Sequence, residues 1–237
     1  MKAFLLAAGK GKRLLPLTET IPKPLIPVAG KPLILRHIEQ LKLTGINEFI
    51  INTHWLADKL QNYLGDGSEL GVQIHWSHEQ ELLETGGGIK KALPLIGEEP
   101  FLIVSSDIWT DFDYISFVKT PLSNEEVARL VLVDNPAHNA MGDFSLATES
   151  AELAKDLSPL CMPSPANPNT LTYSGIALVD PRWVASWRFG DNAFPLREPL
   201  FKAIENNQIS GYYHSGEWSD VGNLERLQAI RDKLEVE

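Results

Sequence analysis

The sequence predicts an α/β fold in which helices cover both faces of a doubly wound sheet. Short apolar segments typical of buried strands recur at residues 4–8, 49–52, 72–76 and 101–104, and segments with helical spacing lie between them. A strand, a crossover helix and a second strand in this order form a parallel pair with a right-handed connection. Ligands of such sheets bind at the carboxyl ends of the strands, so we expect the functional residues there.

The helices and the later strands follow from the same spacing rules. Leucine and isoleucine recur at helical intervals after Pro32, and Gly45 ends that pattern. Four prolines between residues 158 and 169 predict an irregular surface connection. The predicted helices are 33–41, 56–64, 88–95, 196–206 and 224–234, and the later predicted strands are 129–135 and 170–179.

Length and composition predict one ordinary globular domain. The chain has 237 residues, of which 43% are hydrophobic and 22% are charged. Cys161 is the only cysteine, which excludes an intrachain disulfide and a cysteine-based metal site. The segment from Gly9 to Arg13 interrupts the first apolar run too soon for a signal peptide, and no run approaches the roughly 20 apolar residues of a membrane span. We therefore expect a cytoplasmic monomer that does not bind a membrane.

Charge is distributed unevenly along the chain. The formal net charge of −10 argues against a nucleic-acid surface, which needs clustered lysine and arginine. Residues 1–42 nevertheless carry eight basic and two acidic side chains, while the remainder is strongly acidic. A basic segment in an acidic protein fits a small anionic ligand better than a polymer.

A glycine-rich basic loop follows the first predicted strand. Residues 6–13 are Leu-Ala-Ala-Gly-Lys-Gly-Lys-Arg. Glycines let backbone N–H groups approach phosphate oxygens, and the basic side chains supply positive charge. A dinucleotide fingerprint needs a glycine where Leu14 stands, and a P-loop needs Lys-Ser/Thr after its last glycine. The loop therefore predicts a polyphosphate site of a different kind, and the missing glycine disfavours a Rossmann dehydrogenase.

Residues 6–13, followed by Pro-Lys-Pro at 22–24, resemble the signature of the sugar-1-phosphate nucleotidylyltransferases. Further matches occur at 83–89, at 142–144 and at 218–226, so the resemblance covers essentially the whole chain. It implies a Rossmann-like, doubly wound mixed sheet of the nucleotidylyltransferase type in a single catalytic domain, residues 1–237. Within that domain, residues 1–110 are expected to bind mainly nucleotide and residues 111–237 mainly sugar phosphate.

The most similar branch of that family transfers UMP from UTP to N-acetyl-α-muramate 1-phosphate in peptidoglycan recycling. The products are UDP-N-acetylmuramate and pyrophosphate. Glucose-1-phosphate branches usually carry Glu-Lys-Pro in their sugar half, and no such tripeptide follows Asp143. The chain ends near the expected end of the catalytic domain, so we expect no appended acetyltransferase.

Two alternatives remain open. The first is transfer from UTP, dTTP or GTP to another sugar 1-phosphate, such as that of glucose, mannose or heptose. A few loop contacts decide which base and which sugar bind. The second is a sensor that binds a sugar nucleotide without turnover. Retention of Arg13, Lys23, Asp107 and Asp220 argues against the sensor.

The resemblance also implies the site residues. Asp107 follows a predicted strand and Asp220 precedes a glycine turn, and Mg²⁺ takes one or two carboxylates plus phosphate oxygens. A sugar phosphate is itself a nucleophile, so catalysis needs placement and charge neutralisation, with Arg13 and Lys23 as the catalytic residues. His138 lacks a partner at ligand spacing, and we expect it to have no role. The implied nucleotide-binding residues are Leu6, Ala8, Gly9, Gly11, Lys12, Arg13, Lys23, Gly86, Gly87 and Ser105; the implied sugar-binding residues are Asp143, Gly175 and Asp220; the implied Mg²⁺ ligands are Asp107 and Asp220.

Overall fold

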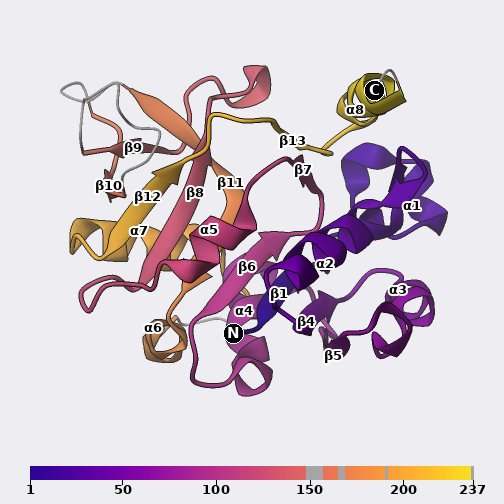
Figure 1. Cartoon of the computed structure of the whole chain (residues 1–237), viewed down its shortest axis with the longest axis horizontal. Coiled ribbons are helices and arrows are strands. Elements are labelled where there is room, and N and C mark those ends of the chain that lie inside the picture. The colour runs from indigo at the N-terminus through magenta and orange to yellow at the C-terminus, as the bar shows by residue number, and fades with distance from the viewer. Residues whose placement is uncertain (148–156, 165–168, 190–191, 236–237) are drawn as a thin grey trace.

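A nine-stranded mixed sheet forms the centre of the protein, as a computed structural model shows (Figure 1). The structure describes residues 1–147, 157–164, 169–189 and 192–235. The strand order is β5-β4-β1-β6-β11-β8-β12-β10-β9, with β1 parallel to both β4 and β6 and with β11 antiparallel to β6 and β8. These strands are β1 (Ala3–Leu6), β4 (Glu48–Thr53), β5 (Gln73–His78), β6 (Phe101–Ser105), β8 (Ala128–Val133), β9 (Phe144–Leu146), β10 (Ser158–Cys161), β11 (Thr170–Val179) and β12 (Ile209–Tyr213).

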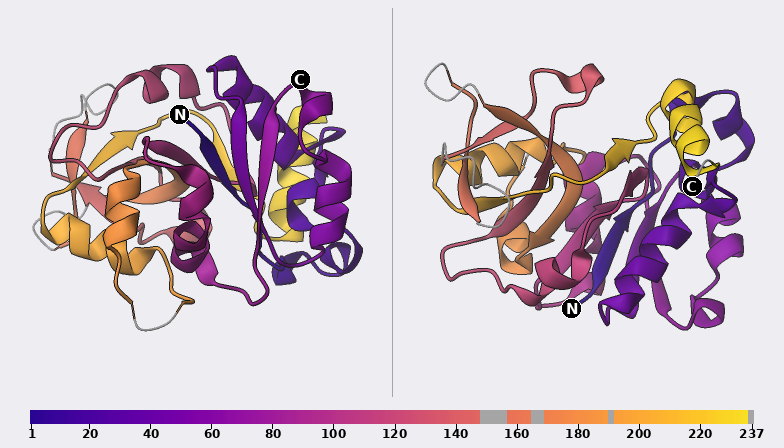
Figure 2. Two further views of the ribbon diagram at one scale, coloured as in Figure 1. Left: turned by 90° about the horizontal axis from the view of Figure 1, so that it is seen from below. Right: turned by 45° about the horizontal axis from the view of Figure 1, so that its top comes forward.

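Helices lie on both faces of the sheet, which confirms the predicted doubly wound α/β class (Figures 1 and 2). Apolar side chains of α4, α6 and α7 join the core on one face, and those of α2, α3 and α5 join the core on the other. The helices are α1 (Leu17–Thr20), α2 (Leu33–Leu43), α3 (Ala57–Leu64), α4 (Glu84–Ile96), α5 (Tyr114–Lys119), α6 (Pro181–Ser186), α7 (Arg197–Glu205) and α8 (Leu224–Glu235). None of the helices within the described ranges has the length and apolarity needed to cross a membrane.

The carboxyl-terminal helix returns to the amino-terminal segment. Leu227 and Ile230 of α8 pack with Leu14, Ile26 and other buried residues in a third apolar cluster. This segment also holds the short hairpin of β2 (Pro27–Val28) and β3 (Lys31–Pro32). Figure 2 shows α8 beside this part of the chain. Packing of α8 fixes the chain that leads out of β13 (Trp218–Asp220), which pairs with β7 (Ile108–Thr110).

Two predicted boundaries differ from the structure by more than two residues. The expected irregular connection begins with β10, in which Ser158 and Leu160 are buried while Pro159 is exposed. Pairing with β12 and β9 provides the hydrogen bonds, which local sequence does not reveal. Residues 165–168 of this connection lie outside the described residues. Helix α4 begins at Glu84, four residues before its predicted start, so the three glycines at 86–88 lie in its first turns.

The α4 glycines are required by packing. A Cβ on Gly86 would lie 2.5 Å from the ring of Phe194, and one on Gly87 would overlap the carbonyl oxygen of Asn192. The carbonyl oxygen of Phe194 accepts hydrogen bonds from both glycine N–H groups, at 2.9 and 3.1 Å. The absent side chains therefore let the 192–194 segment lie directly against the helix.

Gly87→Ala is expected to lower the free energy of unfolding by about 2 kcal/mol, because overlap with backbone outweighs the gain of about 1 kcal/mol in helix propensity. Urea denaturation measures the change. Gly9→Ala is the matched control: a Cβ there meets nothing within 4 Å, and we expect a change below about 0.5 kcal/mol. Equal unfolding free energies for the Gly87→Ala and wild-type proteins would contradict the packing role.

Candidate active site

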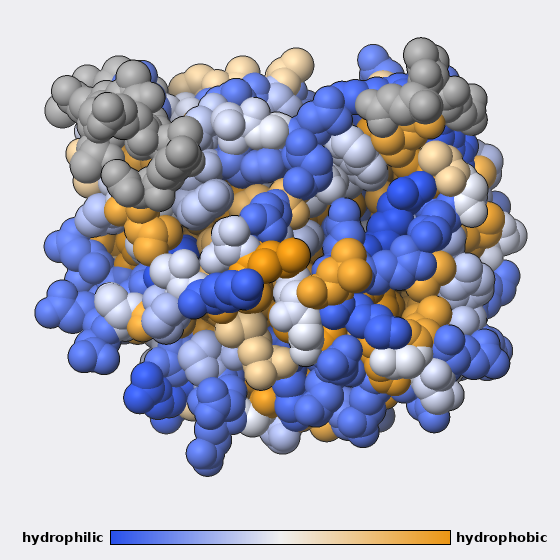
Figure 3. All heavy atoms as spheres, in the orientation of Figure 1, coloured by the Kyte–Doolittle hydropathy of each residue, from blue (hydrophilic) through white to orange (hydrophobic). Residues whose placement is uncertain are grey.

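Two adjoining cavities lie at the carboxyl ends of the central strands. The smaller cavity measures about 480 Å³ and the larger about 930 Å³. Both are open to solvent and have polar as well as apolar groups in their walls. In the orientation of Figure 1 the molecular surface is mostly hydrophilic, with small hydrophobic groups between (Figure 3). The residues that line both cavities are Leu6, Arg13, Glu84, Thr85, Ser105 and Asp107.

The predicted site residues line one or both of these cavities, with two exceptions. The larger cavity includes Asp143, Gly175 and Asp220. Gly86 and Gly87 line neither of these cavities, because helix α4 holds them against residues 192–194. The predicted residues that line the smaller cavity are Leu6, Ala8, Gly9, Gly11, Lys12, Arg13, Lys23, Ser105 and Asp107.

The basic loop owes its shape to Gly11 and Thr18. Gly11 has a φ of 62°, a left-handed conformation that favours glycine. A Cβ there would lie 2.8 Å from the Thr18 methyl group and 3.3 Å from the Cβ of Lys23. The carbonyl oxygen of Gly11 accepts hydrogen bonds from Thr18 Oγ1 at 2.9 Å and from Leu14 N at 2.8 Å. The close approach of Gly11 to Lys23 brings together the glycine-rich loop, residues 6–13, and the Pro-Lys-Pro segment, residues 22–24.

A buried polar network missed by sequence analysis connects the loop to helix α4. Asn52, at the end of β4, accepts a hydrogen bond from Ala7 N at 2.7 Å and donates one to Glu79 Oε1 at 2.7 Å. The other carboxylate oxygen of Glu79 accepts from Leu83 N at 3.0 Å. A Cβ on Gly88 would lie 2.7 Å from Glu79 Oε1, which explains the third glycine. Because the partners are far apart in the chain, no local pattern indicates them.

Glu84 is another residue that the sequence did not indicate. It lines both cavities and has a φ of 58°, in the left-handed region that non-glycine residues rarely adopt. Such backbone strain persists where surrounding structure fixes it, and it clusters at functional sites.

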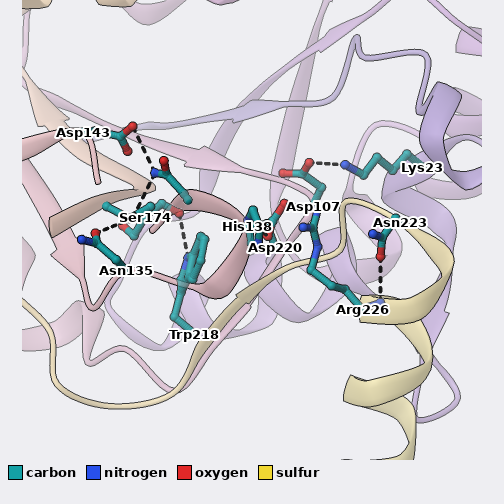
Figure 4. A network of polar contacts seen from close by, with 12 residues as sticks. Lys23, Asp107, Asn135, His138, Asp143, Ser174, Trp218, Asp220, Asn223 and Arg226 are labelled. Carbon is teal, nitrogen blue, oxygen red and sulfur yellow. Dashed lines mark hydrogen bonds and ion pairs between the residues drawn. The ribbon is translucent and has the colours of Figure 1, made fainter. Parts of the chain in front are cut away.

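The two predicted metal ligands lie on neighbouring chain segments. Asp107 stands between β6 and β7, and Asp220 ends β13. In the β7–β13 pair Asp220 is opposite Ile108, and Val221 N donates a hydrogen bond of 2.7 Å to the carbonyl oxygen of Asp107. The Asp107 carboxylate forms an ion pair with Lys23, whose side chain is only 12% exposed (Figure 4).

Asp220 has two basic neighbours, Arg226 and His138. Arg226 donates a hydrogen bond of 3.0 Å to its Oδ2. The Nε2 atom of His138 lies 3.0 Å from its Oδ1, but the angles exclude a hydrogen bond, so this buried oxygen has no hydrogen-bond partner among the residues that the structure describes (Figure 4). Folding brings His138 to a carboxylate that is distant from it in the sequence, and spacing along the chain does not indicate this contact.

These carboxylates fit a hard divalent cation. The described residues contain no group of three or more His, Cys, Asp and Glu side chains that could hold a metal alone. A cation at this site therefore takes its remaining oxygen atoms from water or from a phosphate ligand, as Mg²⁺ does beside one or two carboxylates. The Oδ1 atom of Asp220 and the carboxylate of Asp107 are the protein oxygen atoms available to coordinate such a cation.

A polar network also orders the far side of the larger cavity. Asp143 Oδ2 accepts a hydrogen bond from Tyr173 N at 2.9 Å, and its Oδ1 accepts from Asn139 Nδ2 at 3.2 Å. Asn139 also donates to Thr172 Oγ1 at 3.1 Å. Gly175, with a φ of 88°, lets β11 pass close to Ser105, since a Cβ there would lie 2.6 Å from Ser105 Oγ.

His37 supports the strand that follows Asp107. It is buried on helix α2, and its Nε2 lies 2.9 Å from the carbonyl oxygen of Ile108. That geometry fits the neutral tautomer with a proton on Nε2. Burial lowers the pKa of His37 from 6.5 to about 4, against smaller raising effects of Ile108 and Asp107.

Protonation of His37 is expected to weaken folding at acid pH. Between pH 4 and 6.5 the unfolded chain binds a proton at His37 that the folded chain excludes. The stability that depends on neutral His37 is therefore fully present above pH 6.5 and decreases as the pH falls towards 4. The full shift corresponds to about 3 kcal/mol of unfolding free energy. Urea denaturation at pH 7, 5.5 and 4 should show a shallower loss in His37→Gln than in the wild type. Identical losses of unfolding free energy in the two proteins would contradict the role of His37 in this pH dependence.

Comparison with known proteins places the chain in a family. Residues 2–147 match the family model described as nucleotidyl transferase. The chain belongs to the nucleotidyl transferase family. It is 44% identical over 231 residues to an N-acetylmuramate alpha-1-phosphate uridylyltransferase of Neisseria meningitidis serogroup B, covering 96% of both chains. It is 30% identical to a protein of the same name from Caulobacter vibrioides, covering 98% of this chain and 96% of that protein.

A solved structure agrees with the nucleotidyl transferase fold. A putative glucose-1-phosphate thymidylyltransferase from Bacillus anthracis, crystallised with sucrose, superimposes with a TM-score of 0.83 at 19% identity. The match covers 98% of this chain and 94% of that one. At this identity the similarity shows the fold alone, and it confirms the predicted sheet of the nucleotidylyltransferase type.

Proposed function

We propose that this nucleotidyl transferase transfers UMP from UTP to N-acetyl-α-muramate 1-phosphate, in the cytoplasm, as a monomer. Products are UDP-N-acetylmuramate and pyrophosphate. The observation that carries the proposal is the meeting of two cavities at Arg13, Ser105 and Asp107, with the glycine-rich basic loop in one and Asp143 in the other. The substrates themselves are those named for the relatives at 44% and 30% identity.

The mechanism needs no nucleophilic side chain. An oxygen of the sugar phosphate attacks the α-phosphorus of UTP, the new P–O bond forms, and the bond to the β-phosphate oxygen breaks as pyrophosphate leaves. Backbone N–H groups of residues 9–12 and the Arg13 guanidinium hold the triphosphate in place for in-line attack. Lys23 neutralises the charge that develops around the α-phosphate.

Asp107 and Asp220 would hold Mg²⁺ where the cavities meet. When bound, Mg²⁺ supplies positive charge to the phosphate oxygens. Asp143, fixed by Tyr173 N and Asn139, presents its remaining acceptor capacity to hydroxyl or amide donors of the sugar. We assign no nucleotide contact to Gly86 and Gly87, whose role is packing.

Pyrophosphate release tests the proposal. UTP, dTTP, GTP and CTP are each combined with N-acetylmuramate, N-acetylglucosamine and glucose 1-phosphates in the presence of Mg²⁺. Release chiefly with UTP and N-acetylmuramate 1-phosphate is the expected result. Release with another pair overturns the substrate assignment but keeps the chemistry. Absence of release from folded protein with every pair favours a sugar-nucleotide sensor.

A further inference from the structure

Arg197 differs from most arginines of the protein. Six of the eight arginine side chains donate a hydrogen bond to a carbonyl or carboxylate oxygen; these are Arg36, Arg129, Arg182, Arg188, Arg226 and Arg231. Arg13 and Arg197 have no such partner among the described residues. Both of these arginines line the larger cavity. Unpaired guanidinium groups in an acidic protein indicate sites for an anionic ligand.

Of these two arginines, only Arg197 is confined to the larger cavity. Arg13 lines both cavities and lies with the basic loop. His138, the third basic side chain of the larger cavity, is beside Asp220. An anion bound away from the phosphate groups therefore has Arg197 as its available cation. The acidic residues of the same cavity, Glu84, Asp107, Asp143 and Asp220, repel an anion from the other parts of its wall.

An apolar surface adjoins Arg197 on the same helix. Leu200 and Phe201 follow it by three and four residues on α7, so their side chains share one side of the helix with it. Both line the larger cavity, and Phe201 is 38% exposed. The ring of Phe144, from β9, lies edge-on to Phe201 at 6.3 Å between centroids. This end of the cavity thus offers a cation beside exposed apolar carbon.

Helix α7 adds to the attraction for an anion. Arg197 is its first residue, and no side chain caps that end of the helix. The amino-terminal end of a helix carries partial positive charge that favours an anion. Glu198 in the first turn offsets part of that charge, so Arg197 is the main source of positive charge at this end. The favourable ligand here is therefore an anion with an apolar group attached.

We propose that Arg197 binds the lactyl carboxylate of N-acetylmuramate 1-phosphate, while Leu200, Phe201 and Phe144 pack against the lactyl methyl group. The inference rests on the proposed function and assigns the residue that selects muramate over glucosamine. The lactyl ether carries a carboxylate and a methyl group on one carbon, whereas N-acetylglucosamine has a hydroxyl group at that position. Arg197 thus provides the distinguishing contact, and the phosphate groups remain with Arg13 and Lys23.

Charge is tested separately from shape. Initial rates are measured with N-acetylmuramate 1-phosphate, with its lactyl methyl ester and with N-acetylglucosamine 1-phosphate, for wild type, Arg197→Gln, Arg197→Lys and Lys202→Gln. The methyl ester keeps the lactyl group but removes its charge. Lys202 lies on the same helix, is exposed and does not line the cavity, so Lys202→Gln controls for loss of a positive charge. Calorimetric titration with UDP-N-acetylmuramate and UDP-N-acetylglucosamine measures binding without turnover.

In Arg197→Gln, we expect kcat/KM for the free acid to fall about 10- to 100-fold, the range of a lost charge-assisted hydrogen bond. The values for the ester and for N-acetylglucosamine 1-phosphate should fall less than about threefold, so preference for the acid over the ester disappears. Arg197→Lys should restore part of the preference, because it keeps the charge but not the planar fork. Lys202→Gln should retain the full preference.

Different outcomes separate the inference from the proposed function. If the wild type turns over N-acetylmuramate 1-phosphate and Arg197→Gln keeps the same preference for acid over ester, the Arg197 assignment is overturned and the function stands. Equal losses with all three sugar phosphates also overturn it, because they place Arg197 on a group common to all. If the wild type does not use N-acetylmuramate 1-phosphate, both proposals fail.

Discussion

Replacement of Lys23 by alanine is expected to lower kcat about a thousandfold, with a smaller effect on the KM for UTP. The transferred phosphoryl group gains charge in the transition state, and a fixed cation that meets it there contributes on the order of 10²–10⁵ in rate. Lys23 is fixed in this way: it begins a short helical turn between two prolines, and its side chain is mostly buried beside Asp107. Steady-state kinetics with UTP and N-acetylmuramate 1-phosphate measures the effect.

The fold should tolerate this change. Asp107 loses its ion-pair partner, but its side chain is 33% exposed and solvent can hydrate it, so we expect the unfolding free energy to change by less than about 1 kcal/mol. Lys31→Ala is the matched control, because Lys31 lies in the same basic segment, pairs with Glu39 on the surface and lines neither cavity. Near-normal turnover in Lys23→Ala would refute its catalytic role.

Much of the fold and of the smaller cavity was predictable because local pattern and global topology agree there. Buried parallel strands have continuous apolar sequences, and β1, β4 and β6 each show one. Once those strands are parallel neighbours, their carboxyl ends meet at one edge. That geometry brings the basic loop, Ser105 and Asp107 together without any further information.

Long-range packing decided the features that sequence analysis missed. The glycines at 86–88 fit a ligand-binding turn and a tightly packed helix equally well, and the 192–194 segment selects the helix. His138 follows β8 whereas Asp220 ends β13, so their contact joins segments about 80 residues apart. Asn52 meets Glu79 because β4 pairs with β5. Residues whose partners come from distant elements leave no periodic signal in the chain.

Replacement of Asp107 by asparagine is expected to lower kcat by roughly two to three orders of magnitude and to raise the Mg²⁺ concentration for half-maximal rate at least about tenfold. The physical reason is the loss of one of the two carboxylates, Asp107 and Asp220, that we propose as Mg²⁺ ligands. An amide oxygen binds a hard divalent cation more weakly than a carboxylate oxygen does. Asp220→Asn should act in the same direction. Mg²⁺ titration of pyrophosphate release measures both. Asp58→Asn, at an exposed position on α3 outside both cavities, is the control.

The two variants at the Lys23–Asp107 ion pair should move Mg²⁺ binding in opposite directions. Without nucleotide, Lys23 forms an ion pair with the carboxylate that we propose as a metal ligand, so we expect lysine and metal to compete for Asp107. Lys23→Ala removes the competitor and should strengthen Mg²⁺ binding to the free protein, whereas Asp107→Asn removes the ligand and should weaken it. Calorimetric titration of the free protein distinguishes these effects. Unchanged binding in Asp107→Asn would exclude Asp107 as a metal ligand, and weaker binding in Lys23→Ala would contradict the competition.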